Sequence, residues 1–566
     1  MEQEGKLDDK TVVNDADLEK LPQDQNLADR LGDAHVNILP LKKLLISFAA
    51  MATALFIAFA DQTSVTIGLA SIAKDLHAET TINWAGTASL LANTVCQVLF
   101  GRFADIFGRK NMLLGSLALL GIANLGCGFV KTGVQYYILR AFSGIGAGGI
   151  QSISMTIVSD IVTLKQRGKF QGILGSTIGI SNAFSPLIMA GFIEHSTWRN
   201  FYRLTPPLCA IIFITVYFLI EDRKKELNQI LTMRQKFKKI DYLGVVMSSA
   251  ALTLLLIPIS GGGSTYSWNS KIIIIFFCLG GVSLITFLFI EWKIPELPMI
   301  PLRLFKTPSL SFLLLTNFFF GMTYYGFIYY TPYYYQLVRG FSIIRSAILM
   351  FPLVLPMAVS SILAGAYMSW CGHYIVVIYA GFSLWLLGNC LLLTWNENSS
   401  IADITIVLII MGFGVGSVFQ PSMVACQAQS RKADRAVVIS TRNVIRSFGG
   451  AVGIAICSLI MTNTLIKQVD NELQNENSIL SKNFLNYIKQ NIYSRADLSN
   501  LNQQQLKLIR SMYMKSLRNV YYLLIPLIAI CLLACIPIKD KGMSCIDEIS
   551  VTEDENRSKW KNFILK

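Results

Sequence analysis

The stretch Gly101-Arg102-Phe103-Ala104-Asp105-Ile106-Phe107-Gly108-Arg109-Lys110 decides the fold of this chain. It lies between two hydrophobic stretches, each long enough to cross a bilayer. Its two glycines, seven residues apart, allow a tight turn and a close approach of neighbouring backbone. Asp105 can accept hydrogen bonds from the free N–H groups of a following helix or pair with an arginine. Arg109 and Lys110 favour a cytosolic position. The stretch therefore predicts a short cytosolic connection between two membrane helices.

The composition indicates an all-α integral membrane protein. Of the 566 residues, 53% are hydrophobic and only 15% are charged, whereas soluble domains carry about 25% charged residues. The net charge of +14 does not indicate nucleic-acid binding, because many of the basic residues lie in short loops between apolar stretches. Topology explains them more simply.

Apolar stretches of about 20 residues recur along the chain and predict fourteen membrane spans. They cover residues 44–69, 82–101, 111–130, 135–158, 170–193, 204–220, 241–260, 271–290, 309–334, 344–367, 373–395, 401–424, 436–463 and 517–537. Twelve spans would leave the apolar stretches 241–260 and 271–290 unexplained.

Positive charge predicts the orientation of these spans. One side of the membrane collects Lys42, Lys43, Arg102, Arg109, Lys110, Lys165, Arg167, Lys169, Arg223, Lys224, Lys225, Arg234, Lys236, Lys238, Lys239, Lys293, Arg303, Lys306, Arg431, Lys432 and Arg435. The short loops opposite hold fewer basic residues. Because short cytosolic loops are rich in Lys and Arg, both termini are expected in the cytosol.

The spans divide the chain into five parts. Residues 1–40 form an acidic polar tail without the apolar core of a signal peptide, and we expect this tail to be disordered. Residues 41–220 and 301–540 each hold six spans, and residues 221–300 hold a cytosolic linker with two further spans. Residues 464–516 form the longest loop, non-cytosolic, with room for short amphipathic helices. Residues 541–566 form a cytosolic tail.

A faint internal repeat supports this division. Gly365 and Gly372, at the end of the tenth span, are seven residues apart, as Gly101 and Gly108 are at the end of the second. Glycines of the fourth span are echoed in the twelfth: they are Gly144, Gly146 and Gly148, and Gly412, Gly414 and Gly416. Small residues let membrane helices pack closely. The repeat indicates two equivalent six-helix bundles with spans 7 and 8 inserted between them.

Two charged pairs within the spans are candidates for function, because ionisable groups in hydrocarbon are costly. Asp61 in the first span and Arg140 in the fourth would both lie in the outer half of the membrane. Arg442 and Arg446, four residues apart in span 13, share a helical face. The pair either extends to the inner headgroups or forms the floor of a cavity that favours anionic or neutral cargo.

Polar and aromatic residues in the spans are candidates for lining a substrate cavity. They are Gln62, Asn93, Gln97, Gln151, Tyr325 and Tyr329, together with Arg446. The amides are equally able to bridge helices, and the aromatic residues of span 9 cannot all point one way.

The Gly101–Lys110 stretch, in its position between spans 2 and 3, resembles the signature loop of the major facilitator superfamily of transporters. Ala60-Asp61-Gln62-Thr63 and Leu139-Arg140-Ala141-Phe142-Ser143-Gly144 resemble the first- and fourth-span motifs of the fourteen-span drug:proton antiporter family, fungal type. Thr331-Pro332 and Phe351-Pro352 resemble fungal toxin and drug exporters. The resemblance covers roughly residues 40–540.

The resemblance implies a role for each group of residues. Asp61 would take and release the coupling proton, with Arg140 sensing its charge. Gating would rest on Gly101, Asp105, Gly108, Arg109 and Lys110. The fifth-span motif would lie at Gly172, Ser185 and Pro186, and of these Gly172 and Pro186 match the family's pattern. Serine replaces two of its glycines, at Ser181 and Ser185, and Met189 and Ala190 replace the final pair.

The expected function is export of small amphipathic compounds by a proton-coupled antiporter that works by alternating access. Two alternatives are a vacuolar basic amino acid:proton antiporter and a non-transporting sensor on a transporter scaffold. Plasma and vacuolar membranes share the same topology and proton direction, so either location fits. The partners implied are the lipid bilayer, a small-molecule substrate and protons, with the protein as a monomer.

The sequence lacks motifs typical of enzymes and of ATP-driven pumps. A phosphate-binding Gly-x-x-x-x-Gly-Lys-Ser/Thr loop is absent, which argues against an ATP-driven pump. No Cys/His cluster predicts a metal site, and the eleven cysteines avoid the outer loops, so structural disulfides are not expected. The proton gradient is the expected energy source, with no cofactor.

Overall fold

The computed structural model describes residues 41–78, 82–162, 164–220, 232–261, 269–293, 298–431, 434–474, 479–490, 502–540 and 542. The described part of the chain is helical, and fourteen helical spans are long and apolar enough to cross a membrane, as predicted. The long helices are α3 (Leu41–Asp75), α4 (Asn83–Phe107), α5 (Arg109–Cys127), α6 (Gly133–Ile161), α7 (Leu164–His195), α8 (Trp198–Leu219), α11 (Tyr242–Gly261), α12 (Lys271–Lys293), α13 (Pro308–Tyr333), α15 (Phe351–Cys371), α16 (Ile375–Leu392), α17 (Ile401–Phe419), α19 (Arg435–Gln474) and α21 (Gln503–Ala534). Four short helices are α10 (Met233–Lys238), α14 (Ile343–Ile348), α18 (Pro421–Ala428) and α20 (Lys482–Gln490).

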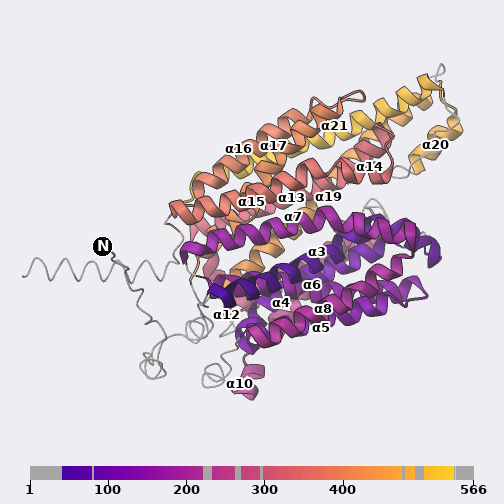
Figure 1. The fold of residues 1–566 in the computed structure, drawn as a ribbon. Helices are drawn as coiled ribbons and strands as arrows, with labels where there is room; N and C mark the ends of the chain where they lie inside the picture. Colours follow the sequence, from indigo (N-terminus) through magenta and orange to yellow (C-terminus); the bar gives the residue numbers. More distant parts are fainter. Residues whose placement is uncertain are drawn as a thin grey trace, which may run out of the picture.

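The long helices run side by side in two groups (Figure 1). Helices α3 to α8 pack on one another, and α13, α15, α16, α17, α19 and α21 form the second group. The groups meet along two crossings, α7 against α15 and α4 against α19. Helices α11 and α12 pack on each other, and α11 also contacts α4 and α19. The inserted pair therefore lies beside the second of these crossings.

The predicted glycine repeat has a structural counterpart in both groups. Gly108 separates α4 from α5 with φ +93°, and Gly372 ends α15 with φ +76°, a conformation that other residues rarely adopt. The first glycine of each pair lies at a crossing between the groups. Gly101 faces Ser440 of α19, and Gly365 faces Gly168 of α7. The two crossings are therefore built in the same way.

The loop predicted at residues 464–516 is shorter in the structure. Helix α19 continues to Gln474 and α21 begins at Gln503, so both ends of that segment are helical. These extensions are polar, and a hydropathy pattern marks only the part of a helix that lies in hydrocarbon. Helix α20, between them, buries Leu485 and Ile488, as expected for a short amphipathic helix.

Close contact between α13 and α19 depends on glycine. Gly449 and Gly453 lie against the backbone of Phe318 and Met322, and Gly321 lies against the carbonyl oxygen of Arg446. A β-carbon at any of these positions would collide with backbone, which cannot move aside as a flexible side chain can. Such small-residue contacts replace the hydrophobic effect as the force that joins helices in lipid.

We predict that Gly321→Ala lowers the melting temperature of the detergent-purified protein by several degrees. Overpacking a tight contact costs about 1–3 kcal/mol, and here the strain falls on the backbone of α19. Gly115→Ala is the matched control, since an added β-carbon at this exposed glycine meets nothing within 4 Å. Equal melting temperatures for the two variants would contradict this account of the α13–α19 contact.

Candidate functional site

Asp61 and Arg140 form an ion pair between α3 and α6. Nη1 of Arg140 lies 2.7 Å from Oδ2 of Asp61, and Nη2 donates to the Asp61 carbonyl at 3.2 Å. The Ser143 hydroxyl donates to the same carboxylate oxygen at 3.3 Å. Both charged side chains are at most 1% exposed. The second carboxylate oxygen, Oδ1, is buried without a hydrogen-bond partner among the described residues, which leaves one oxygen able to take a proton.

Four amide side chains form a buried ladder within the first group of helices. Gln151 donates to Gln62 at 3.3 Å, and Gln97 donates to Gln151 at 2.9 Å and to Asn93 at 2.6 Å. The ladder joins α3, α6 and α4. Nε2 of Gln62 and Nδ2 of Asn93 are buried donors with no acceptor among the described residues. Because buried polar atoms are nearly always paired, these atoms are candidates for contact with a cargo.

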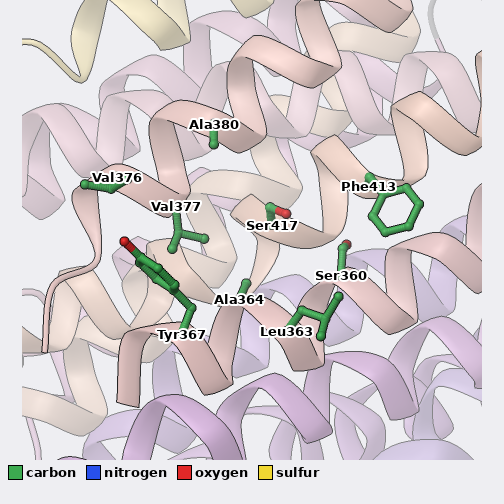
Figure 2. A pocket seen from close by; sticks show the side chains of 9 residues that line it. All are labelled: Ser360, Leu363, Ala364, Tyr367, Val376, Val377, Ala380, Phe413 and Ser417. Carbon is green, nitrogen blue, oxygen red and sulfur yellow. The ribbon is translucent and has the colours of Figure 1, made fainter. Parts of the chain in front are cut away.

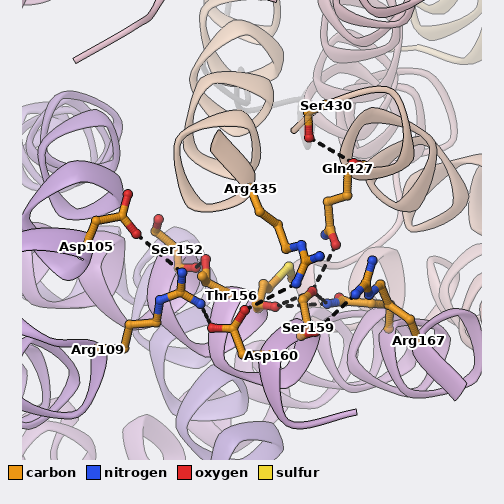
Figure 3. A network of polar contacts seen from close by, with 12 residues as sticks. Asp105, Arg109, Ser152, Thr156, Ser159, Asp160, Arg167, Gln427, Ser430 and Arg435 are labelled. Carbon is orange, nitrogen blue, oxygen red and sulfur yellow. Dashed lines mark hydrogen bonds and ion pairs between the residues drawn. The ribbon is translucent and has the colours of Figure 1, made fainter. Parts of the chain in front are cut away.

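The predicted gating residues gather at one end of the molecule, which we call the loop end because it carries the stretch 101–110. Asp105 accepts from Arg109 at 3.3 Å, and Arg109 also contacts Asp160 near the end of α6 (Figure 3). Asp160 lies 3.5 Å from Arg435, the first residue of α19. A continuous buried ion network therefore links α4, α5 and α6 to the second group of helices.

Neutral hydrogen bonds close the same end. Ser152 and Ser440 are 2.7 Å apart, and Gln427 of α18 accepts from Ser159 at 3.0 Å (Figure 3). Across the other crossing, Ser361 donates to the Gly172 carbonyl at 3.0 Å. The loop end of the structure is thus sealed by contacts between the two groups. An alternating-access transporter would have to break these contacts to open here.

Lys110 contacts the end of α8. Its Nζ donates to the Tyr217 carbonyl at 2.7 Å and lies 5.2 Å from the centre of the Tyr217 ring. It caps the end of α8, where free carbonyl groups favour a positive charge. Lys110 therefore links the start of α5 to the end of α8, and its gating role stays a prediction.

Arg442 and Arg446 are buried, at 0% and 4% exposure, so neither extends to the headgroups. Arg442 donates to the Phe419 carbonyl and, at 2.8 Å, to the Ser422 hydroxyl. Arg446 makes no hydrogen bond or ion pair with the described residues and packs against rings. Its guanidinium carbon lies 4.7 Å from the centre of Phe419 and 6.0 Å from that of Tyr325. Two buried positive charges therefore stand together without a described carboxylate.

The two tyrosines proposed for the cavity have different surroundings. Tyr325 packs against Gly450 and lies under Arg446. Tyr329 is 48% exposed, and its ring contacts Tyr330 and Tyr333. The structure thus brings Tyr325 to the arginine pair and does not bring Tyr329 there, although the two residues are one helical turn apart.

The altered fifth-span motif keeps close packing. Gly172 of α7 lies against Gly365 and Ser361 of α15. Ser181 donates to the Phe56 carbonyl of α3 at 2.7 Å, and Ser185, next to Pro186, donates back to the Ser181 carbonyl.

Met189, the bulky replacement in that motif, is fully buried against Gly68 of α3. The glycine on one helix makes room for the methionine on the other. The contact between α3 and α7 is therefore preserved by a different pair of residues.

From the sequence, Asp61 is the acid expected deep within a span. Asp105, Asp160 and Glu291 are buried as well, each close to the end of a helix that can span the membrane. The predicted fourth span ended at residue 158, which left Asp160 in a loop, whereas α6 continues to Ile161. Arg435 was counted only as a topological charge. A sequence signal for this pair does exist. Asp160 lies within one turn of the end of one span, and Arg435 lies at the start of another.

At the far end of α3, beyond the apolar span Lys42–Val65, a separate clamp joins α3 to α8. Asp75 accepts from Arg199 and, at 3.0 Å, from Trp198. The hydrogen bond and charge of Arg199 hold the pKa of Asp75 below its ordinary value. Because the folded pKa is lowered, the clamp contributes at neutral pH and is lost as pH falls through that lowered value.

A surface pocket of about 400 Å³ lies between α15, α16 and α17 (Figure 2). Its lining is mostly apolar, with Leu363, Val376 and Tyr367 partly exposed. The lining contains no charged side chain, and none of the residues discussed above contributes to it. We therefore place the functional site at the buried charges and not in this groove.

A bundle of membrane helices in two packed groups, with a buried ion network where the groups meet, is the architecture expected of a membrane transporter. A family model of the Major Facilitator Superfamily matches residues 51–454. The chain belongs to this superfamily, and the relatives described below are transporters and not enzymes.

Several known proteins are similar to this chain. It is 41% identical over 525 residues to "Citrate exporter 1" of Yarrowia lipolytica, covering 92% of this chain and 76% of that one. It is 31% identical to "Efflux pump dotC" of Dothistroma septosporum, covering 76% and 73% of the two chains. The fold resembles the solved proton:xylose symporter XylE, with a TM-score of 0.56, 10% identity, and coverage of 90% and 99%.

We predict that Arg435→Gln opens the loop end. Removing one partner of a buried ion pair leaves Asp160 with less compensation, which costs several kcal/mol in other proteins. In a Ser152→Cys/Ser440→Cys background, oxidative disulfide formation reports closure, because the two hydroxyl oxygens are 2.7 Å apart. The cross-linked fraction should fall in the Arg435→Gln variant.

Arg431→Gln provides the control, since it removes an exposed arginine from the segment just before α19. This control should leave cross-linking unchanged. Undiminished cross-linking in the Arg435→Gln variant would show that the ion network does not hold the loop end closed.

Proposed function

We propose that this protein is a proton-coupled exporter of small organic anions, with di- and tricarboxylates as the leading class. The observation that carries the proposal is Arg446, a buried guanidinium that makes no ion pair or hydrogen bond with the described residues. A charged group in the membrane interior is costly to keep unless it serves a ligand or a partner. A carboxylate cargo would provide that partner while it is bound.

The surroundings of Arg446 favour an anion over a cation. Arg442 is held one turn away by Phe419 and Ser422, and together the two guanidiniums create a positive potential that attracts anions and repels cations. Arginine can also bind a carboxylate through two parallel hydrogen bonds. The similarity to a citrate exporter, at 41% identity, supports the same class of cargo.

The amide ladder supplies a second set of polar contacts. Unpartnered donors on Gln62 and Asn93 suit the carboxylate and hydroxyl oxygens of a hydroxy acid. We propose that the cargo binds between the arginine pair of one helix group and the amide ladder of the other. Alternating access would then move the two groups about this cargo.

Asp61 and Arg140 are proposed to couple transport to protons. Protonation at the open oxygen of Asp61 would neutralise the carboxylate and weaken its hold on Arg140. The released guanidinium can then take other partners as the helices move. The proton gradient would supply the energy, without a cofactor.

Export of amphipathic drug-like compounds is the second candidate function. The rings of Phe419 and Tyr325 beside Arg446 would suit a planar organic acid, and the similarity to an efflux pump supports such a cargo. Basic amino acids fit less well, because the two arginines would repel them and Asp61 is already bound by Arg140. A monomer in the plasma or vacuolar membrane, with both termini cytosolic, fits either function.

We predict that Arg446→Gln strongly lowers the exchange of labelled citrate by sealed proteoliposomes. Losing a charged hydrogen-bond partner of a bound carboxylate costs about 2 kcal/mol or more, which corresponds to a loss of about 30-fold in kcat/KM. Arg345→Gln is the control, because Arg345 is exposed and stacks only on Phe341 among its described contacts.

Exchange in the Arg446→Gln variant at the wild-type rate would refute the anion site. If the wild-type protein does not exchange citrate but does exchange a planar drug-like acid, the cargo belongs to the second candidate class.

A second prediction concerns coupling. Asp61→Asn should keep citrate-for-citrate exchange, which needs no net proton movement, but lose the acceleration that an imposed pH gradient gives to wild-type protein. Asparagine has nearly the shape of aspartate and can still accept a hydrogen bond from Arg140, but it cannot ionise. Because the buried Arg140 loses its carboxylate partner, the melting temperature of the variant is measured alongside to confirm that it is folded. An undiminished response to the gradient would remove Asp61 from the proton pathway.

A further inference from the structure

Helix α10 carries an exposed surface that the transport mechanism does not use. The α10 surface consists of Met233, Arg234, Phe237 and Lys238, all exposed. Met233 and Phe237 are 59% and 53% exposed. Residues four apart share a helical face, so an apolar pair lies directly beside a basic pair.

This six-residue helix is held in place despite its length. Gln235 accepts from the Thr232 backbone N–H at 2.9 Å in a capping box, which stabilises the start of a helix. Lys236 is buried, at 3% exposure, and Asp241 just downstream caps α11 by accepting from the Gly244 N–H at 2.8 Å. These local contacts stabilise the helix that presents the α10 surface.

The α10 surface is also joined to the loop end. Phe237 packs edge-on against Phe107, with ring centres 5.3 Å apart, and Phe107 packs in turn against Phe103. Both phenylalanines belong to the 101–110 stretch that forms the seal. Figure 1 shows α10 at the margin of the bundle, to one side of the long helices and near the end of α5.

Exposed apolar and basic residues side by side are typical of helices that lie in a membrane interface. There the apolar side chains enter the boundary of the acyl chains, and the cations meet anionic headgroups.

We propose that the α10 surface binds anionic phospholipid headgroups of the adjacent leaflet and thereby favours the closed state of the loop end. The headgroup phosphates pair with Arg234 and Lys238, and Met233 and Phe237 enter the interface. Through Phe237 and Phe107, this contact holds the end of α4 against the crossing with α19. The inference does not depend on which cargo is transported.

The test compares protein reconstituted in phosphatidylcholine with protein in phosphatidylcholine plus phosphatidylserine. Lipid retained after purification is measured by native mass spectrometry, and closure by the Ser152→Cys/Ser440→Cys cross-link. Arg234→Gln/Lys238→Gln should retain phosphatidylserine about tenfold less well, because each basic residue near the surface contributes to headgroup attraction. Its cross-linking should no longer rise with phosphatidylserine.

Lys42→Gln/Lys306→Gln is the matched control, since it removes two exposed lysines from the same end of the molecule outside α10. This control should behave as wild type. Equal retention and closure in all three proteins, or equal binding of both lipids by wild type, would overturn the proposal. Phe107→Ala leaves the α10 surface intact, so it should keep lipid retention and lose the effect of phosphatidylserine on closure. A retained effect would refute the route through Phe107.

Discussion

The structure depends on one constraint: an ionised side chain inside a membrane protein must have a compensating partner. Asp61 meets it with Arg140, and Asp160 meets it with Arg109 and Arg435. Arg446 is the contrasting case, since aromatic rings alone surround its guanidinium among the described contacts. The Asp61–Arg140 pair lies within one helix group, and the Asp160 network spans both groups. Arg446 has no charged partner among the described residues. This sorting assigns three different tasks to three sets of buried charges.

The two helix groups share a plan but only one of them carries the charged seal. In each group, a glycine at a crossing is followed seven residues later by a glycine with positive φ. Gly101 therefore corresponds to Gly365. The second copy, however, lacks a counterpart of Asp105 and of the basic residues around it. The α4–α19 crossing holds the ion network, whereas the α7–α15 crossing uses glycines and serine hydrogen bonds. Breaking the seal at the loop end is thus an electrostatic event on one side and a loss of packing on the other.

The sequence predicted what hydropathy and composition control. Fourteen spans, the glycine turn at Gly108 and the candidate pair Asp61 and Arg140 were visible, because each is a local deviation within an apolar pattern. Asp160 and Arg435 were missed because each lies at a span end, where a charge is ordinary, and only their meeting in space makes them informative. The surroundings of Tyr325 and Tyr329 could not be predicted from the sequence either, since they depend on which helix packs against each residue. From the sequence, Met189 is too bulky for the close packing of the fifth-span motif. The structure accommodates it because Gly68 lies opposite.

The central claim is that Arg446 is the anchor for an organic anion. The most direct test is calorimetric titration of citrate into purified wild-type protein and Arg446→Gln, without a gradient or a membrane, so that binding is measured apart from transport. The account predicts saturable binding to wild type that is weakened about 30-fold or more in the variant, with Arg345→Gln unchanged. Equal affinity of all three proteins for citrate would contradict the account.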